Sequence, residues 1–211
     1  YLNNEAVKIA NGEYILLLNN DIEVISENWL EAMLGYARLN DIGAVGALLY
    51  YPNDTIQHCG VIAGLGGAAG HCYSQFPRQK EHGIISARVP TNFSAVTAAC
   101  LMVSKDKFIE VGMLNEVELK VAFNDVDFCF KLLESGYRNI VHSGAKLYHY
   151  ESISRGKEDT DEKRKRFASE ARYLKLRHSE IIDNDKFYNY NLSKVHDNRL
   201  RIISEENKNY K

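Results

Sequence analysis

The sequence predicts an α/β fold, and three observations in its first 50 residues support this. Apolar residues recur at helical spacing over residues 3–11 and again from Trp29. Short, wholly apolar runs stand at residues 14–18 and 43–50, as expected of buried strands. These segments alternate as helix, strand, helix and strand, which is the order typical of α/β domains.

The elements of the first quarter follow in order. Residues 3–11 form a helix, and Gly12 is the expected C-cap. Residues 14–18 read as a parallel strand covered on both faces. Ser26 is the expected N-cap of the next helix, whose apolar stripe comprises Trp29, Leu30, Met33, Leu34 and Ala37. Residues 43–50 form a second buried strand, followed by a turn over 52–54.

The remaining elements are less regular. Residues 60–70 are expected to form a flexible loop of small residues, and residues 94–103 a strand of small side chains whose backbone can be closely approached. Helices are expected over 104–112 and from Val126 to a stop at Gly136. Two short strands are expected within 137–150. A charged helix over about 159–178 and a polar tail follow.

The composition restricts the class of protein. The chain is 45% hydrophobic and 26% charged, which is typical of a soluble globular protein. A net charge of −2 predicts no general attraction to nucleic acid, and no apolar run is long enough to cross a bilayer. The four cysteines are expected to be buried, reduced thiols of a cytosolic protein. Because the chain begins at Tyr1 within a helical pattern, we expect a fragment of something longer.

The first candidate site follows the first strand, where Asn19, Asn20 and Asp21 end the apolar run. Open α/β sheets bind ligands beyond the carboxyl ends of their strands. Asp21 is therefore well placed to hold a hard cation, with two amides beside it. The alternative is a simple turn, because these residue types are common turn formers.

The second candidate site is at the start of the helix near residue 126, where Asn124, Asp125 and Asp127 stand together. A carboxylate at a helix N-terminus is stabilised by free N–H groups and the helix dipole, so a structural role is plausible. One cap needs only one carboxylate, however. The second carboxylate is free to act as a general base.

The third candidate is His149, which closes the last predicted strand. Strand alternation places Leu147 and His149 on one face, with Tyr148 and Tyr150 on the other. A histidine in this position is either a hydrogen-bonded residue or a metal ligand.

Two other patterns are discarded as chance matches. Residues 64–69 match the dinucleotide-binding pattern G-x-G-x-x-A, but the required helix does not follow, and no acidic residue lies about 20 positions on at the end of a predicted strand. His58-Cys59 and His71-Cys72 resemble a zinc site. On extended strands, however, adjacent side chains point to opposite faces, so each pair could supply only one ligand.

Five stretches in consistent order resemble inverting family-2 glycosyltransferases of GT-A fold, especially rhamnosyltransferase-like bacterial members. They are NGEYILLLNNDIEV, GAVGALLYYPNDTIQHCGVIAG, VTAACLMVSKDKFIEVGMLNE, NDVDFCFKLLESGYR and LYHYESISRG. The resemblance spans residues 1 to about 156. It implies a GT-A-like, Rossmann-like mixed sheet flanked by helices, and transfer of a sugar from a nucleotide-sugar donor to a glycan or lipid-linked acceptor in cell-surface polysaccharide synthesis.

The resemblance also implies roles for individual residues. Asp21 would bind a divalent metal, Mn²⁺ or Mg²⁺, and His149 would be a further ligand. Asp125 would be the catalytic base. Substrate-binding positions would be Asn19, which stands where the family motif has its first Asp, together with Asn20, Ala99 and Asn124.

The resemblance suggests a division at about residue 156. Residues 1–156 would be the C-terminal portion of the GT-A-like domain, without the upstream region that binds the nucleotide base, so this chain alone could be inactive. Residues 157–211 would be a charged helical extension and polar tail. A truncated or degenerate non-catalytic binding or assembly module is the alternative. A nucleotidyltransferase would be expected to carry a basic Gly-rich phosphate loop near its start, which this sequence lacks.

The charged helix permits two interpretations. Its apolar stripe of Phe167, Ala171 and Leu174 predicts packing of one face on the domain. Its basic residues, Lys157, Lys163, Arg164, Lys165, Arg166, Arg172, Lys175 and Arg177, also allow contact with anionic lipid over residues 157–178. The expected location is therefore the cytoplasm, with peripheral contact at the inner face of the cell membrane as the sharper hypothesis.

Overall fold

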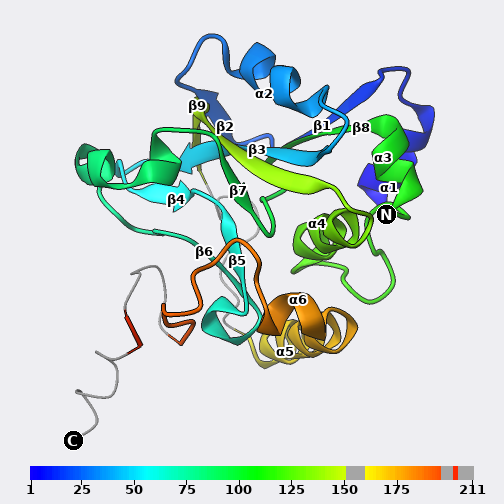
Figure 1. The fold of residues 1–211 in the computed structure, drawn as a ribbon. Coiled ribbons are helices and arrows are strands. Elements are labelled where there is room, and N and C mark those ends of the chain that lie inside the picture. The colour runs from blue at the N-terminus through cyan, green and yellow to red at the C-terminus, as the bar shows by residue number, and fades with distance from the viewer. Residues whose placement is uncertain (151–159, 196–201, 204–211) are drawn as a thin grey trace, which may run out of the picture.

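The computed structural model describes residues 1–150, 160–195 and 202–203. Within these residues, seven strands form one mixed sheet with the order β1-β8-β3-β9-β2, to which β4 is added beside β3 and β7 beside β9 (Figure 1). These strands are β1 (Tyr14–Leu18), β2 (Ile22–Val24), β3 (Ile42–Tyr50), β4 (Ile56–His58), β7 (Thr91–Phe93), β8 (Cys100–Ser104) and β9 (Arg138–His149). The β3–β9 pair is parallel and the other pairs in this sheet are antiparallel.

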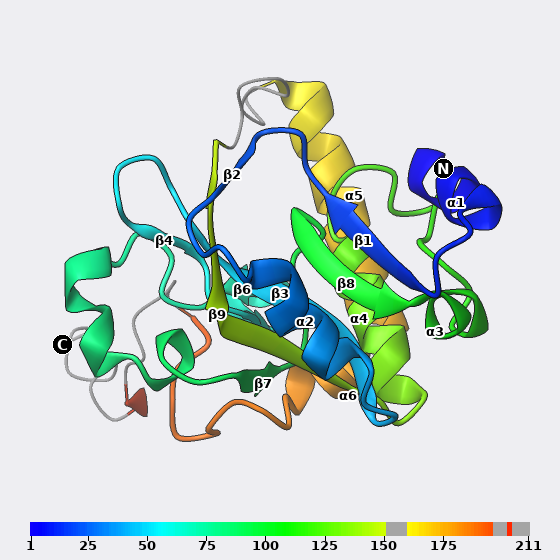
Figure 2. The same ribbon diagram turned by 90° about the horizontal axis from the view of Figure 1, so that it is seen from above.

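Helices cover both faces of the sheet (Figures 1 and 2). One face carries α2, and the other carries α3 and α4, with α5 and α6 packed beyond α4. The helices are α1 (Leu2–Ile9), α2 (Trp29–Ala37), α3 (Lys105–Glu110), α4 (Asn124–Glu134), α5 (Asp161–Arg177) and α6 (Ser179–Asp183). Short 3₁₀ turns lie at Leu65–Gly67, Arg78–Gly83 and Ile85–Ala87.

Strand β3 is the centre of the fold, and every one of its residues is buried. Because side chains alternate along a strand, Val45 and Leu49 join Met33 of α2 in one core. Ala44 and Leu48 join Phe128 of α4 in the other core. The wholly apolar run at 43–50 is therefore explained by helices on both faces, as the sequence predicted.

Two details at the N-terminal side differ from prediction. β1 is not parallel: it pairs antiparallel with β8, and its alternating burial leaves Leu18 exposed. A short apolar run does not encode the direction of its neighbour. Helix α2 begins at Trp29 with Asn28 at the N-cap, and the hydroxyl of Ser26 instead accepts a hydrogen bond of 3.2 Å from the backbone N–H of Lys146.

The expected loop over 60–70 is instead a small hairpin. β5 (Val61–Ala63) pairs antiparallel with β6 (Ala69–His71), so the small residues here form backbone hydrogen bonds with one another. Gly60 precedes the hairpin with a φ of 109°, and a Cβ at that position would lie 2.3 Å from the ring of Phe93. Glycine is therefore required there on both conformational and steric grounds.

Residues 137–150 were expected to form two strands, but β9 is one strand. Its pairing with β3 shifts register between Ala47 and Leu48, which interrupts the ladder without ending the strand. The strand expected over 94–103 is shorter than predicted, since β8 begins only at Cys100.

Helix α5 is bound to the rest of the protein by polar and apolar contacts. Leu174 is fully buried, and the ring of Phe167 lies 5.1 Å from that of Phe123. Tyr173 accepts a hydrogen bond from the amide of Asn115, and Arg177 forms an ion pair with Glu134. The packing part of the prediction is thus confirmed, while Lys157 lies outside the described residues. No described helix combines the length and the apolar character needed to cross a bilayer.

Candidate active site

The pairing of β2 with β9 brings Asp21 and His149 together. Ile22 stands opposite His149 in the antiparallel register, and the backbone N–H of Tyr150 donates to the carbonyl of Asp21 at 2.9 Å. The Oδ1 atom of Asp21 lies 3.2 Å from Nε2 of His149, and both side chains are largely buried. Two residues far apart in the sequence therefore present their polar atoms to one point.

The geometry of this pair fits a shared divalent ion. Asp21 Oδ1 is buried and finds no hydrogen-bond partner among the described residues, so it can accept a cation. Two ligands at about 2.0–2.3 Å from one ion, at right angles, lie about 3 Å apart. Within the described part of the chain no group of three or more His, Cys, Asp or Glu side chains could hold a metal. The pair would thus need further oxygen ligands from water or substrate.

Asn19 and Asn20 lie in the turn that joins β1 to β2, so the turn interpretation of this stretch is correct as local structure. The backbone N–H of Asn19 donates to the carbonyl of Ala99 at 3.0 Å, and its side-chain Nδ2 lies 3.0 Å from His149 Nε2. Asn20 is exposed in the same turn. Through Asn19 the turn therefore contacts both the ring of His149 and the segment that precedes β8.

The segment of residues 94–99 is held by one backbone bridge, between Ala95 and Val61, and by side chains. Asn139 donates to the carbonyl of Ser94, and the N–H of Val96 donates to the sulfur of Cys129. The N–H of Thr97 donates to Nε2 of His58 at 3.4 Å. Buried backbone groups need partners; Ala95 pairs with the backbone of Val61, and the groups on either side of it bond to these side chains instead of to a second strand. This is why the segment does not extend β8.

Asp125 is bound to the same segment. Its Oδ2 accepts a hydrogen bond of 2.9 Å from the N–H of Ala98, and its Oδ1 accepts one of 2.9 Å from the N–H of Val126 at the start of α4. The side chain is partly exposed, so lone pairs remain for a proton from solvent or substrate. Asp125 binds Ala98 and Asn19 binds Ala99. Two adjacent residues of one segment therefore connect the predicted base with the turn that carries the predicted metal ligand Asp21.

The two other predicted substrate-binding residues flank these contacts. Ala99 is buried, and its N–H donates to Oγ1 of Thr97 at 3.3 Å. Asn124 is the first residue of α4, and its amide donates to the carbonyl of Val121 at 3.4 Å, which closes the turn before the helix. Both residues shape the backbone around Asp125, and a direct role toward a donor sugar stays a prediction.

The contacts of Asp127 indicate a structural role. It is buried, forms an ion pair of 3.0 Å with Lys131, and accepts from Nε2 of His178 at 2.9 Å. Burial alone would raise the pKa of the Asp127 carboxyl, but the hydrogen bond from His178 and the charge of Lys131 outweigh it and lower this pKa. The ionised Asp127 therefore links α4 to His178, the residue that follows α5.

The four-residue set resembling a zinc site is not assembled. The rings of His58 and His71 meet with their Nδ1 atoms 3.0 Å apart, whereas the sulfur of Cys59 contacts the hydroxyl of Ser86 at 3.2 Å. Burial of His58 lowers the pKa of its imidazole well below the ordinary value, which favours the neutral ring that accepts from Thr97. No local pattern around His58 indicates that it supports residues 94–99.

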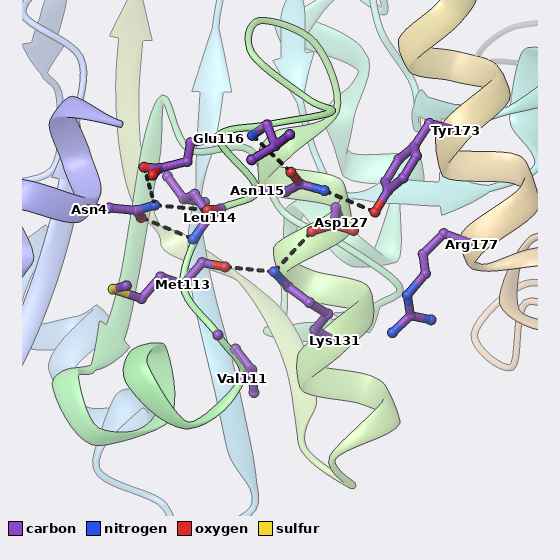
Figure 3. A pocket seen from close by; sticks show the side chains of 12 residues that line it. Asn4, Val111, Met113, Leu114, Asn115, Glu116, Asp127, Lys131, Tyr173 and Arg177 are labelled. Atoms are coloured by element: carbon purple, nitrogen blue, oxygen red, sulfur yellow. Dashed lines mark hydrogen bonds and ion pairs between the residues drawn. The ribbon is translucent and has the colours of Figure 1, made fainter.

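A pocket of about 390 Å³ lies elsewhere, between residues 111–117, α4 and α5 (Figure 3). Of the residues in the three predicted candidate sites, only Asp127 lines it. Its polar groups are already paired: Asn4 bonds to Leu114 and Glu116, and Lys131 donates to the carbonyl of Met113. These contacts identify the pocket as a structural junction between helices.

Comparisons with known proteins agree with this architecture. No family model matches the chain. It is 47% identical over 192 residues to the uncharacterized protein y4gI of Sinorhizobium fredii, and 36% identical over 159 residues to the O-antigen biosynthesis protein RfbC of Myxococcus xanthus. These matches cover 91% and 73% of this chain. The chain spans only 21% and 12% of those two relatives.

A solved structure of GalNAc-T7 with UDP, GalNAc and Mn²⁺ superposes with a TM-score of 0.57, covering 83% of this chain and 40% of that one at 12% sequence identity. At this identity the match establishes the fold alone. The chain therefore has the GT-A-like α/β fold that its sequence predicts.

Proposed function

We propose that this chain carries the metal and base portion of an inverting, sugar-nucleotide-dependent glycosyltransferase, related to family 2, that acts in cell-surface polysaccharide synthesis. The observation that carries the proposal is that both candidate groups are bound to the backbone of residues 98 and 99. Asp125 binds the N–H of Ala98, and the turn that contains Asp21 binds the carbonyl of Ala99. A candidate base and a candidate metal site are thus bound to adjacent residues of one segment.

The comparisons support the class of substrate. The Myxococcus relative is named for O-antigen biosynthesis, and the structural neighbour was solved with a nucleotide, a sugar and Mn²⁺. We infer a nucleotide-sugar donor and a glycan or lipid-linked hydroxyl acceptor for this chain. Asn19, Asn20, Ala99 and Asn124 would line the donor side.

The proposed chemistry uses one base. Asp125 accepts the proton of the acceptor hydroxyl as its oxygen forms a bond to the anomeric carbon, from the face opposite the leaving group. The bond from that carbon to the donor diphosphate breaks, and its electron pair leaves with the diphosphate. A divalent ion held by Asp21 and His149 would neutralise charge on that diphosphate. A phosphate leaving group needs no second carboxylic acid, unlike the leaving oxygen in glycoside hydrolysis.

The test is a screen of nucleotide sugars with the 211-residue chain and with a longer protein that contains it. Release of nucleoside diphosphate gives turnover, and the anomeric coupling constant in NMR gives the configuration of the product. Donor-dependent transfer with inversion supports the proposal. Retained configuration would reject the inverting mechanism, and donor binding without release from either protein would favour the non-catalytic module.

A further inference from the structure

Gln57 is a buried residue of β4 that the proposed chemistry does not use. It lies at a bulge: Leu49 pairs with His58 and Tyr50 pairs with Ile56, so Gln57 is the extra residue of the bulge. Bulges often redirect a side chain near a functional site. Here the amide of Gln57 reaches His149, the imidazole beside Asp21.

Two contacts define how Gln57 meets His149. Its Oε1 lies 2.6 Å from Nδ1 of the ring, and its Nε2 donates to the backbone carbonyl of His149 at 3.4 Å. The opposite amide orientation would set two oxygens against each other, so the carbonyl contact fixes which end faces the ring. An amide oxygen can only accept, and the hydrogen of a neutral His149 therefore sits on Nδ1.

In this neutral form the other ring nitrogen carries a lone pair. Asn19 Nδ2, which can only donate, lies 3.0 Å from His149 Nε2 and is consistent with this assignment. Asp21 Oδ1 also lies 3.2 Å from this nitrogen and has no hydrogen-bond partner among the described residues. A carboxylate oxygen and an imidazole lone pair repel each other unless a proton or a metal cation lies between them.

We propose that Gln57 is a positioning residue: it fixes the Nδ1–H form of His149 and thereby directs Nε2, with Asp21, at a shared divalent ion. The inference rests on the metal site of the proposed function. It assigns Gln57 the role that outer hydrogen-bond partners of metal-binding histidines commonly have, which is to hold the ring and its tautomer. A glutamine that only filled space would contribute to folding and not to metal affinity.

The first test measures Mn²⁺ affinity of the 211-residue chain by electron paramagnetic resonance, with UDP present to complete the coordination. Gln57→Leu removes the acceptor, Gln57→Glu keeps an oxygen at Nδ1, and Gln79→Leu is a matched exposed control. We expect the Kd for Mn²⁺ to rise about 10–100-fold in Gln57→Leu, which is the usual effect of removing a hydrogen-bond partner of a metal-binding residue. Gln57→Glu should stay within several-fold of wild type and Gln79→Leu should not change.

The outcomes separate this inference from the proposed function. Unchanged affinity in a folded Gln57→Leu chain, or equal losses in the Leu and Glu variants, would overturn the inference and leave the transferase proposal standing. No Mn²⁺ binding by the wild-type chain would reject both the metal site and the inference.

A second measurement does not depend on the variants folding. Nitrogen-15 NMR of the wild-type chain at about pH 8, above the ordinary imidazole range, reports which nitrogen of His149 carries the hydrogen. We expect the Nδ1–H form with an unprotonated Nε2. Observation of the Nε2–H form would overturn the inference directly.

Discussion

The carboxylate of Glu170 on α5 accepts a hydrogen bond of 2.9 Å from the backbone N–H of Ala122, although 48 residues separate the two. The same carboxylate accepts from the N–H of Val121 at 3.1 Å, and Glu170 is buried. Asp125 follows only three residues after Ala122. A helix from the charged C-terminal part of the chain therefore holds the turn that presents the proposed base.

Glu170→Ala should loosen that turn. It leaves two backbone N–H groups without their acceptor, a loss of about 1–3 kcal/mol in the free energy of unfolding for each group that stays buried. We expect faster amide exchange at residues 121–125 by mass spectrometry, and lower kcat in the active protein. Glu162→Ala, on an exposed position of the same helix, is the control. Equal exchange in the two variants would mean that Glu170 does not order the turn.

Asp125→Asn should keep the fold and lose turnover. The amide can retain an oxygen near the N–H of Ala98 but cannot take a proton, and general-base catalysis is worth about 10²–10⁴-fold in rate. Turnover and donor affinity should be measured together in the full-length protein, with Asp106→Asn as a surface control. A kcat within a few-fold of wild type would remove Asp125 from the role of base.

Asp21→Asn should weaken Mn²⁺ binding more than it weakens folding. The substitution keeps the size of the side chain and removes the charge of a buried oxygen with no hydrogen-bond partner among the described residues. A chelator should likewise abolish turnover in the full-length protein, and added Mn²⁺ should restore it. Unchanged metal affinity in the variant, with an unchanged unfolding midpoint, would exclude Asp21 as a ligand.

Asp127→Asn should destabilise the protein, with little effect on the chemistry. Loss of one partner from a buried ion pair typically costs about 3–5 kcal/mol. Lys131 would lose its carboxylate partner, and His178 would lose one of its two, keeping Glu134. The low pKa of Asp127 in the folded state means that its contribution is present above the unfolded pKa and is lost as the pH falls through the folded value. Urea unfolding from neutral to acidic pH should therefore show a shallower acid decline in the variant.

The lipid hypothesis for α5 predicts weak, salt-sensitive binding to anionic vesicles. Arg172 and Lys175 are exposed, and each cation near such a surface contributes about 1 kcal/mol. Sedimentation with anionic and with neutral vesicles, repeated at high salt, measures this for the wild type and for Arg172→Glu with Lys175→Glu. Binding that ignores lipid charge, or no binding, leaves α5 a purely structural helix.

Periodicity was enough to predict the central elements of the fold. The buried run of β3 and the stripe of α4 carry their own pattern, and each forms where expected. The partner of each strand, and whether the two strands run parallel or antiparallel, were not predictable. The partner of β1 depends on a strand that follows more than 80 residues later, and the small residues of 60–70 have no period that distinguishes a hairpin from a loop.

The candidate site was predictable only in part. Asp21 and Asp125 stand at the ends of elements, where polar residues in an apolar context are visible in the sequence. Gln57 and Glu170 are recognised by what they contact, at sequence separations of 92 and 48 residues. Tertiary contacts of this kind leave no local pattern, so the structure was needed to find them.

The meeting of Asn19 with His149 across 130 residues also has a kinetic consequence. Closing an unstructured loop of that length carries an entropic cost of about 4 kcal/mol, which must be offset by strands already assembled between its ends. A nascent chain cannot form this contact until residue 150 has left the ribosome. We therefore expect Asp21 and His149 to come together late in folding, after the core around β3 has formed. A folding intermediate would then contain that core without the candidate site.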